Sequence, residues 1–271
     1  YRTLYELYQH AHTPWEWIPA LFDRAHEKDI SIFGSVFDET AVDLLEKQQV
    51  PAYKIAAPEI RDIPLLKKVA ATGKPVFLSS GISTLDELAR AVRIVRETGG
   101  QPIIMKCSTA YPTPPQEVNL KTIPNLIEIF DCPVGLSDHT LGMGASIGAV
   151  ALGAMVIEKH VKLPDEEDTV DSFFSLKIEE FAHLVREIKT AQSSLGAVNY
   201  EITPEVSKNR NGHRSLYVCA PIKAGEIFSA KNIKSVRPGF GLDTAYYDLV
   251  LGRKAARDLA AGDRLAWDLI S

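Results

Sequence analysis

The stretch PVGLSDHTLGMGASIGAVALGAMVIEKHV, residues 133–161, decides the fold. It predicts a strand over 133–137, a helix over 145–152 and a second strand over 155–161. Both expected strands are continuous apolar runs, as in parallel strands that are buried on both faces. A strand, a helix and a strand in this order predict one parallel βαβ unit.

The same pattern continues from this stretch toward both ends of the chain. Further strands are expected at 30–37, 52–57, 75–80 and 102–108, and further helices at 14–28, 39–48, 63–71, 84–98, 120–130 and 178–195. Six successive units predict an α/β fold, either a TIM barrel or an open doubly wound sheet. No GxGxxG follows the first strand, which weakens a dinucleotide-binding interpretation. A complete barrel has eight units, so we expect two more, roughly 70 residues, to precede this chain.

The sequence pattern changes after the last long expected helix, where a polar stretch is followed by short expected strands and turns. We expect residues 1–196 to form a partial barrel, 197–213 to be a polar linker and 214–271 to be a small β-rich domain with recurrent turns. A domain of about 60 residues buries little apolar surface. It is therefore expected to dock onto the barrel or onto a second subunit.

Composition excludes some classes of protein and compartment. The formal net charge of the 271 residues is −5, which argues against an extended nucleic-acid surface. The longest apolar run, near 147–157, is broken by glycines and is too short to span a bilayer. Three widely spaced cysteines, an odd number without a CxxC motif, are typical of buried thiols in a reducing compartment. We expect a cytoplasmic protein with no membrane partner.

Two histidines end consecutive expected strands. His139 and His160 would lie on one rim of a barrel, where two imidazoles with open positions suit Mn²⁺, Fe²⁺, Co²⁺ or Zn²⁺. Glu158, two residues before His160, faces the same side of a regular strand. It could be a ligand, a partner of a ligand or a general base. The alternative is that these are unrelated polar residues on the rim.

A cation and several hydroxyls end other strands. Lys54 is the best candidate for an inward-facing lysine, whereas Lys159 neighbours His160 and should face the helices or solvent. Ser79 and Ser137 could help Lys54 to bind phosphate. Lys54 could instead form a Schiff base, as in an aldolase. Arg237 lies on a Pro-Gly turn and could recognise a carboxylate, although the segment alone favours a structural turn.

An ordered series of motifs is similar to a known family. PAYKI (51–55), LSSG (78–81), KCSTAYPTP (106–114), GLSDHT (135–140), VALGA (150–154) and EKH (158–160) resemble the sialic acid synthases. RSLYV (214–218), IKAGE (222–226) and RPGFG (237–241) resemble their antifreeze-like (SAF) domain. TPWEW (13–17) and WDLI (267–270) look more like the pseudaminic acid synthase branch.

The resemblance implies a TIM barrel, a domain-swapped homodimer and a divalent metal. The metal would be Mn²⁺, with Mg²⁺ or Co²⁺ as alternatives, held by His139 and His160. The reaction would condense phosphoenolpyruvate with 2,4-diacetamido-2,4,6-trideoxy-L-altrose. N-acetylneuraminate or legionaminic acid synthesis is the alternative. An ice-binding role is not favoured, because the SAF-like segment has no flat Thr-rich face.

The resemblance also carries residue roles onto matching positions. Phosphoenolpyruvate would contact Lys54, Ser35, Ser79, Ser137, Thr109 and, from the partner subunit's small domain, the position of Arg237. The sugar would lie near Tyr111, Asp171 and Glu59, and the catalytic group would comprise Glu59, Lys54 and Glu158. Ala57 and Thr109 depart from the family's usual serine and asparagine, so these contacts should differ in detail. The family's first-strand glutamate and second-strand lysine have no counterpart in the chain.

Overall fold

The chain folds into two compact units. The structure is a computed structural model that describes residues 3–163, 169 and 171–271. One unit comprises Tyr1–Gly196 and the other Ala197–Ser271. Each has an apolar core of its own.

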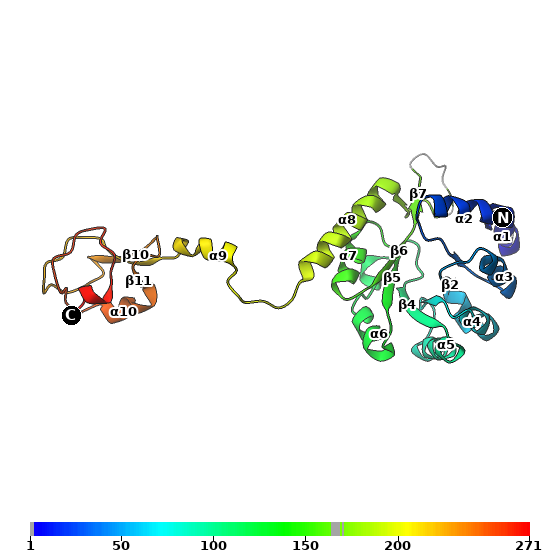
Figure 1. The fold of residues 1–271 in the computed structure, drawn as a ribbon, viewed down its shortest axis with the longest axis horizontal. Helices are drawn as coiled ribbons and strands as arrows, with labels where there is room; N and C mark the ends of the chain where they lie inside the picture. Colours follow the sequence, from blue (N-terminus) through cyan, green and yellow to red (C-terminus); the bar gives the residue numbers. More distant parts are fainter. Residues whose placement is uncertain (1–2, 164–168, 170) are drawn as a thin grey trace. The chain divides into compact units, whose positions relative to one another are not determined.

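A six-stranded parallel sheet organises the first unit (Figure 1). Its strands are β1 (Gly34–Ser35), β2 (Tyr53–Ile55), β3 (Pro75–Ser79), β4 (Gln101–Cys107), β5 (Val134–Asp138) and β6 (Val156–Lys159). Each strand pairs with the one before it in the chain. A doubly wound sheet would reverse its order at a switch point. The continuous order is that of a TIM barrel, and the described strands form an open part of one.

Helices cover the outer face of this sheet (Figure 1). They are α1 (Leu4–Ala11), α2 (Ile18–Glu27), α3 (Glu39–Lys47), α4 (Ile63–Ala70), α5 (Leu85–Thr98), α6 (Thr122–Phe130), α7 (Gly144–Ala151) and α8 (Ile178–Leu195). The ends of α5 follow from its sequence. Thr84 and Glu87 form a capping box at its start, and Gly99 ends it with φ +101°.

The core lies between the sheet and the helices. Its largest members include Tyr53, Leu66, Leu78, Ile104 and Leu136, each at most 1% exposed. This burial explains the continuous apolar runs, because strands that are covered on both faces carry mostly apolar side chains. Most of the expected strands and helices therefore form where the pattern predicts them.

Two expected strands differ from the structure. The strand expected at 30–37 is reduced to β1, which has only β2 as a described neighbour and so makes fewer ladder hydrogen bonds. The strand expected at 155–161 divides into β6 and β7 (Val161–Lys162). β7 leaves the main sheet and pairs with β8 (Leu176–Lys177). The division places His160 at the point where the chain turns out of the sheet.

The second unit is a small antiparallel β structure. β9 (Ser215–Val218) lies between β10 (Ile233–Val236) and β11 (Leu242–Asp243), and α10 (Tyr247–Val250) follows. The core includes Leu216 and Phe228, both fully buried. The stretch expected to be a linker contains α9 (Pro204–Lys208), whose cap Thr203 accepts a hydrogen bond from the Val206 N–H.

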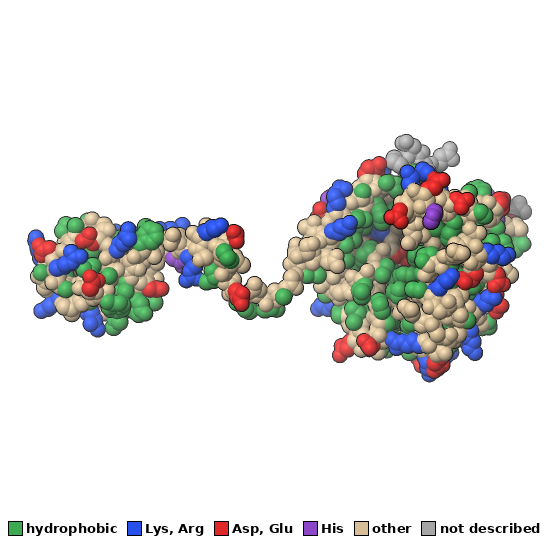
Figure 2. Space-filling view, viewed as in Figure 1, with side chains coloured by type: hydrophobic (Ala, Val, Ile, Leu, Met, Phe, Trp, Pro, Cys, Tyr) green, Lys and Arg blue, Asp and Glu red, His purple; other side chains and the backbone are tan. Residues whose placement is uncertain are grey.

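The surface carries charges of both signs. On the face shown in Figure 2, basic and acidic side chains are interspersed over both units, with no continuous basic stripe. Among the described residues, no helix combines the length and the apolar character needed to cross a bilayer.

Candidate functional site

A cavity of about 560 Å³ opens at the carboxyl ends of the parallel strands. Its polar lining comprises Ser35, Lys54, Ser79, Cys107, Thr109, Tyr111, Ser137, His139, Glu158 and His160. The lining comes from all six strands and the segments that follow them. In TIM barrels this is the face that carries the active site.

Lys54 is the central cation of the cavity floor. Its side chain is only 10% exposed, and Nζ donates a hydrogen bond of 3.0 Å to Ser79 Oγ. Nζ also lies 3.7 Å from Glu158 Oε2. The other oxygen of that carboxylate accepts a 2.9 Å hydrogen bond from Ser137 Oγ. Strands β2, β3, β5 and β6 thus contribute one linked group with an ammonium ion and hydroxyls, which suits a phosphate.

The two histidines lie side by side, as the strand ends predict. The ring centroids of His139 and His160 are 5.3 Å apart. Tyr111 contacts His139 at 4.2 Å between ring centroids, and Phe174 contacts His160 at 4.8 Å. Phe174 is 2% exposed. Tyr111 and Phe174 therefore form an aromatic wall beside the two imidazoles, which shields them from water on that side.

Hydrogen bonding orients the ring of His139. Its Nδ1 lies 2.9 Å from the carbonyl oxygen of Ser108, which can only accept, so Nδ1 carries the proton and Nε2 keeps a lone pair. Burial lowers the pKa of His139, although the bond to Ser108 opposes this. The ring is thus held in the neutral form that a metal requires.

The donor set fits a divalent ion in part. Among the residues that the structure describes, no group of three or more His, Cys, Asp or Glu side chains is arranged to hold a metal. Two neighbouring imidazoles would leave most coordination positions to water and substrate oxygens. Asp171 Oδ2 lies 3.8 Å from His160 Nδ1, within ion-pair distance of that ring but beyond hydrogen-bond distance.

Sequence comparisons identify the family. The profile of the NeuB family matches residues 1–200, and that of the SAF domain matches residues 213–271. The chain belongs to the NeuB family. The predicted membership of the sialic acid synthase family, and the predicted barrel followed by an SAF domain, are therefore confirmed.

Named relatives of this NeuB-family chain include pseudaminic acid synthases. It is 43% identical over 265 residues to that of Campylobacter jejuni, covering 97% of this chain and 77% of the relative. It is also 43% identical over 267 residues to that of Helicobacter pylori, covering 98% and 78%. The crystal structure of N-acetylneuraminic acid synthetase from Leptospira borgpetersenii is similar with a TM-score of 0.69 and 30% identity, covering 73% of this chain and 70% of that one.

Glu59 and Asp171 lie beside the cavity of this NeuB-family chain without lining it. Glu59 belongs to the 3-10 turn Ala57–Arg61, and its Oε2 is buried without a hydrogen-bond partner. Burial raises the pKa of this carboxyl. A half-buried carboxyl with a raised pKa can hold a proton for a reaction.

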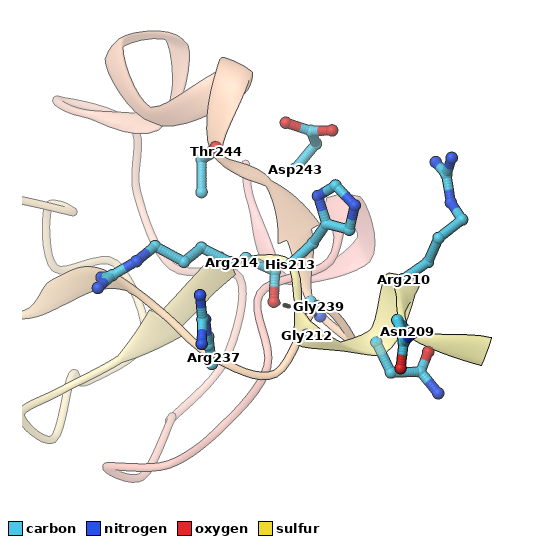
Figure 3. Close-up of a pocket in the computed structure, with 12 residues that line it drawn as sticks. Asn209, Arg210, Gly212, His213, Arg214, Arg237, Gly239, Asp243 and Thr244 are labelled. Atoms are coloured by element: carbon cyan, nitrogen blue, oxygen red, sulfur yellow. Dashed lines mark hydrogen bonds between the residues drawn. The ribbon is translucent and has the colours of Figure 1, made fainter. Parts of the chain in front are cut away.

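Arg237 lies in the second unit, in a pocket of about 940 Å³. Figure 3 shows Arg214 and Arg237 on one side of this pocket and Arg210 on the other. Arg214 donates to the carbonyl oxygen of Ser235 at 2.8 Å. The pocket of the SAF domain is therefore cationic, in keeping with recognition of an anionic group.

The sequence did not single out Cys107 or Phe174 as site residues. The Cys107 thiol lines the cavity at the end of β4, 4.0 Å from His139 Nδ1, and burial raises its pKa, so it stays protonated. It pairs with Ser137 in the β4–β5 ladder, a register that a single sequence does not specify. Phe174 belongs to the turn at residues 171–174, where periodicity predicts nothing.

Proposed function

We propose that this chain is a pseudaminic acid synthase, which condenses phosphoenolpyruvate with 2,4-diacetamido-2,4,6-trideoxy-L-altrose and releases phosphate. The observation that carries the proposal is 43% identity to synthases of this name along 97% of the chain. The cavity supports it, because one strand-end site combines a cation, hydroxyls, a carboxylate and two imidazoles. Legionaminic acid synthesis is the second candidate, supported by 36% identity to such a synthase over 86% of the chain.

Lys54, Ser79 and Ser137 would bind the phosphate of phosphoenolpyruvate. The Lys54 ammonium group has three N–H donors and donates one to Ser79 Oγ, so the other two can be donated to phosphate oxygens. Ser35 and Thr109 would add hydroxyls at the edge of the same cavity. Holding the phosphate on the floor would direct C3 of the enol toward the imidazole side of the site.

The sugar would lie on the imidazole side, near Tyr111, Asp171 and Glu59. A divalent ion, Mn²⁺ before Mg²⁺ or Co²⁺, would be held by His139 and His160 and would polarise the sugar carbonyl when bound. C3 of phosphoenolpyruvate would form a bond to the aldehyde carbon, whose oxygen takes up a proton. Water would add at C2 and give up a proton, and phosphate would leave by cleavage of the bond between C2 and its bridging oxygen. Glu158 and Glu59 would orient that water or take its proton. The aromatic wall would exclude other water.

A homodimer with exchanged SAF domains belongs to the same proposal. Arg237 would then approach the barrel of the partner subunit and fix the carboxylate of phosphoenolpyruvate, a group that matches a planar guanidinium. A cytoplasmic location, expected from three cysteines that are all unpaired, is also proposed.

Phosphate release tests the function directly. The purified protein is given phosphoenolpyruvate, Mn²⁺ and one of three sugars: the altrose derivative, N-acetylmannosamine or the legionaminic precursor. Release with the altrose derivative alone, abolished by EDTA, is expected. Release only with another sugar would reject the substrate but keep the condensation. A lysine adduct with a carbonyl substrate, trapped by borohydride and indifferent to EDTA, would instead support a Schiff-base aldolase that uses Lys54.

A further inference from the structure

An ion pair on the outer face of the sheet lies directly behind the two histidines. Lys159 Nζ is 3.0 Å from Asp138 Oδ2, and the two side chains are 1% and 0% exposed. Asp138 immediately precedes His139, and Lys159 immediately precedes His160. Because side chains alternate along a strand, this pair faces the helices while Ser137 and Glu158 face the cavity.

The register of the two strands makes this placement specific. In the β5–β6 ladder Ser137 pairs with Glu158, and Asp138 pairs with Lys159. The cavity-facing pair is joined by a 2.9 Å hydrogen bond and the outward pair by a 3.0 Å ion pair. The next step along both strands carries the imidazoles. Each strand end is therefore tied to the other on both faces just before its histidine.

The contacts of Lys159 and Asp138 enclose His139. Lys159 Nζ also donates a 2.5 Å hydrogen bond to the carbonyl oxygen of Thr140, so one ammonium group holds residues on both sides of His139. Asp138 Oδ1 accepts hydrogen bonds of 2.8 Å from both the N–H and the hydroxyl of Thr140. Asp138 Oδ2 accepts one of 2.6 Å from Ser146 Oγ on α7. All these groups are satisfied without water.

The energetics of buried ions favour a positioning role over a stabilising one. Two buried charges lose their hydration, and replacing such a pair by apolar residues of similar size is often neutral or stabilising. An apolar pair would pack between the sheet and the helices equally well, but apolar contacts are not directional and would not orient the strand ends. The ion pair and its hydrogen bonds fix the distance between the two strand ends and the direction in which each end points. Two imidazoles that bind one metal ion need both to be fixed.

We propose that Asp138 and Lys159 are positioning residues that set the spacing and orientation of His139 and His160 for metal binding. This inference rests on the proposed function, because it assumes that the imidazoles bind a divalent ion. Neither residue touches the cavity, so their effect is exerted through the strand ends.

The test measures Mn²⁺ affinity and unfolding separately in four variants. They are Lys159→Met, the double variant Asp138→Asn/Lys159→Met, His139→Ala and the control Lys74→Met. Lys74 also forms an ion pair between elements, with Glu46 Oε1 at 2.5 Å, but at the amino end of β3. Titration calorimetry or the electron paramagnetic resonance of free Mn²⁺ gives the affinity, and thermal unfolding gives the stability.

Both Lys159 variants should bind Mn²⁺ about 10- to 100-fold more weakly than the wild type, the usual effect of losing an outer partner of a metal ligand. The double variant leaves no buried unpaired charge, so it should regain stability relative to Lys159→Met without regaining affinity. It also keeps the test valid if Lys159→Met fails to fold. Lys74→Met should change stability alone.

Wild-type affinity in the folded double variant would overturn the positioning role while leaving the metal assignment intact. Recovery of both stability and affinity together in the double variant would show a purely structural role and would overturn it too. No Mn²⁺ binding by the wild type, or unchanged binding by His139→Ala, would reject the metal site itself and the inference with it. The failure of the inference and the failure of the metal assignment are thus distinguished.

Discussion

Replacing Lys54 by methionine should weaken phosphoenolpyruvate binding while leaving the fold intact. The change removes the cation of the cavity floor and keeps a side chain of similar length. Lys54 is 8% exposed and holds Ser79 Oγ at 3.0 Å, so the methionine would fill the same space. Glu158 loses a cation at 3.7 Å but keeps its bond from Ser137. Because 41% of the Glu158 side chain is exposed, water can replace the lysine, and the stability cost should be about 0–1 kcal/mol.

The loss of binding follows from the type of contact that disappears. A hydrogen bond to a charged partner contributes about 1.5–3 kcal/mol. At about 1.4 kcal/mol for each factor of ten, the dissociation constant of phosphoenolpyruvate should rise about 10- to 140-fold. Equilibrium titration of the folded variant with phosphoenolpyruvate measures it. The effect should appear without the sugar, because the contact belongs to the phosphate.

Lys106→Met is the matched control. Lys106 is also a buried strand lysine, 9% exposed, but its Nζ donates to Ser108 Oγ at 3.0 Å and it does not line the cavity. Burial lowers the pKa of Lys106. Its removal should leave phosphoenolpyruvate affinity unchanged. Equal affinities for wild type and Lys54→Met, or equal losses in both variants, would refute the assignment of Lys54 to the phosphate.

Three further predictions concern stability. Burial raises the pKa of Glu59, so the stability that its protonated carboxyl contributes is lost as pH rises through that pKa. Glu59→Gln should therefore raise the thermal midpoint at neutral pH but not in acid. The exposed Glu128 is the control, and Glu128→Gln should leave the thermal midpoint unchanged at both pH values. Gly135→Ala would bring a Cβ to 2.6 Å from the Val156 carbonyl oxygen and should cost about 1–3 kcal/mol in chemical denaturation; an unchanged midpoint would contradict the packing. Phe228→Ala empties the second core and should cost about 3–5 kcal/mol, with hydrogen exchange rising in the second unit alone; faster exchange in both units would show a shared core.

Periodicity predicted the repeated βα units, and strand alternation predicted the cavity floor, whereas the choice of a barrel over a doubly wound sheet came from the family resemblance. Lys54, Ser79, Ser137 and Glu158 occupy inward positions at carboxyl ends, and parallel strands bring such ends to one edge. The outward direction of Lys159 follows from the same rule. Its partner Asp138 does not, because the partner depends on the register between two strands, which a single sequence does not specify.

Residues in irregular segments could not be placed from the pattern. Phe174 reaches both imidazoles from the segment before β8, where neither helical nor strand periodicity exists. Cys107 was interpreted as a buried core thiol, since an apolar side chain at a strand end gives no chemical signal. The family resemblance, rather than alternation, pointed to Tyr111 and Asp171, both of which contact the histidines.

The hydrogen bonds of the cavity floor imply that Glu158 changes partners when phosphate binds. Ser137 gives its only proton to Glu158 in the structure, so it presents lone pairs to the cavity. Donating to a phosphate oxygen requires that hydroxyl to turn away, and phosphate also draws Lys54 from the carboxylate. Glu158 is then free to accept a proton from water at C2, the step that follows carbon–carbon bond formation. Ser137→Ala would release Glu158 in advance, so it should weaken phosphoenolpyruvate binding less than Lys54→Met does, and an equal or larger loss would contradict this exchange of partners.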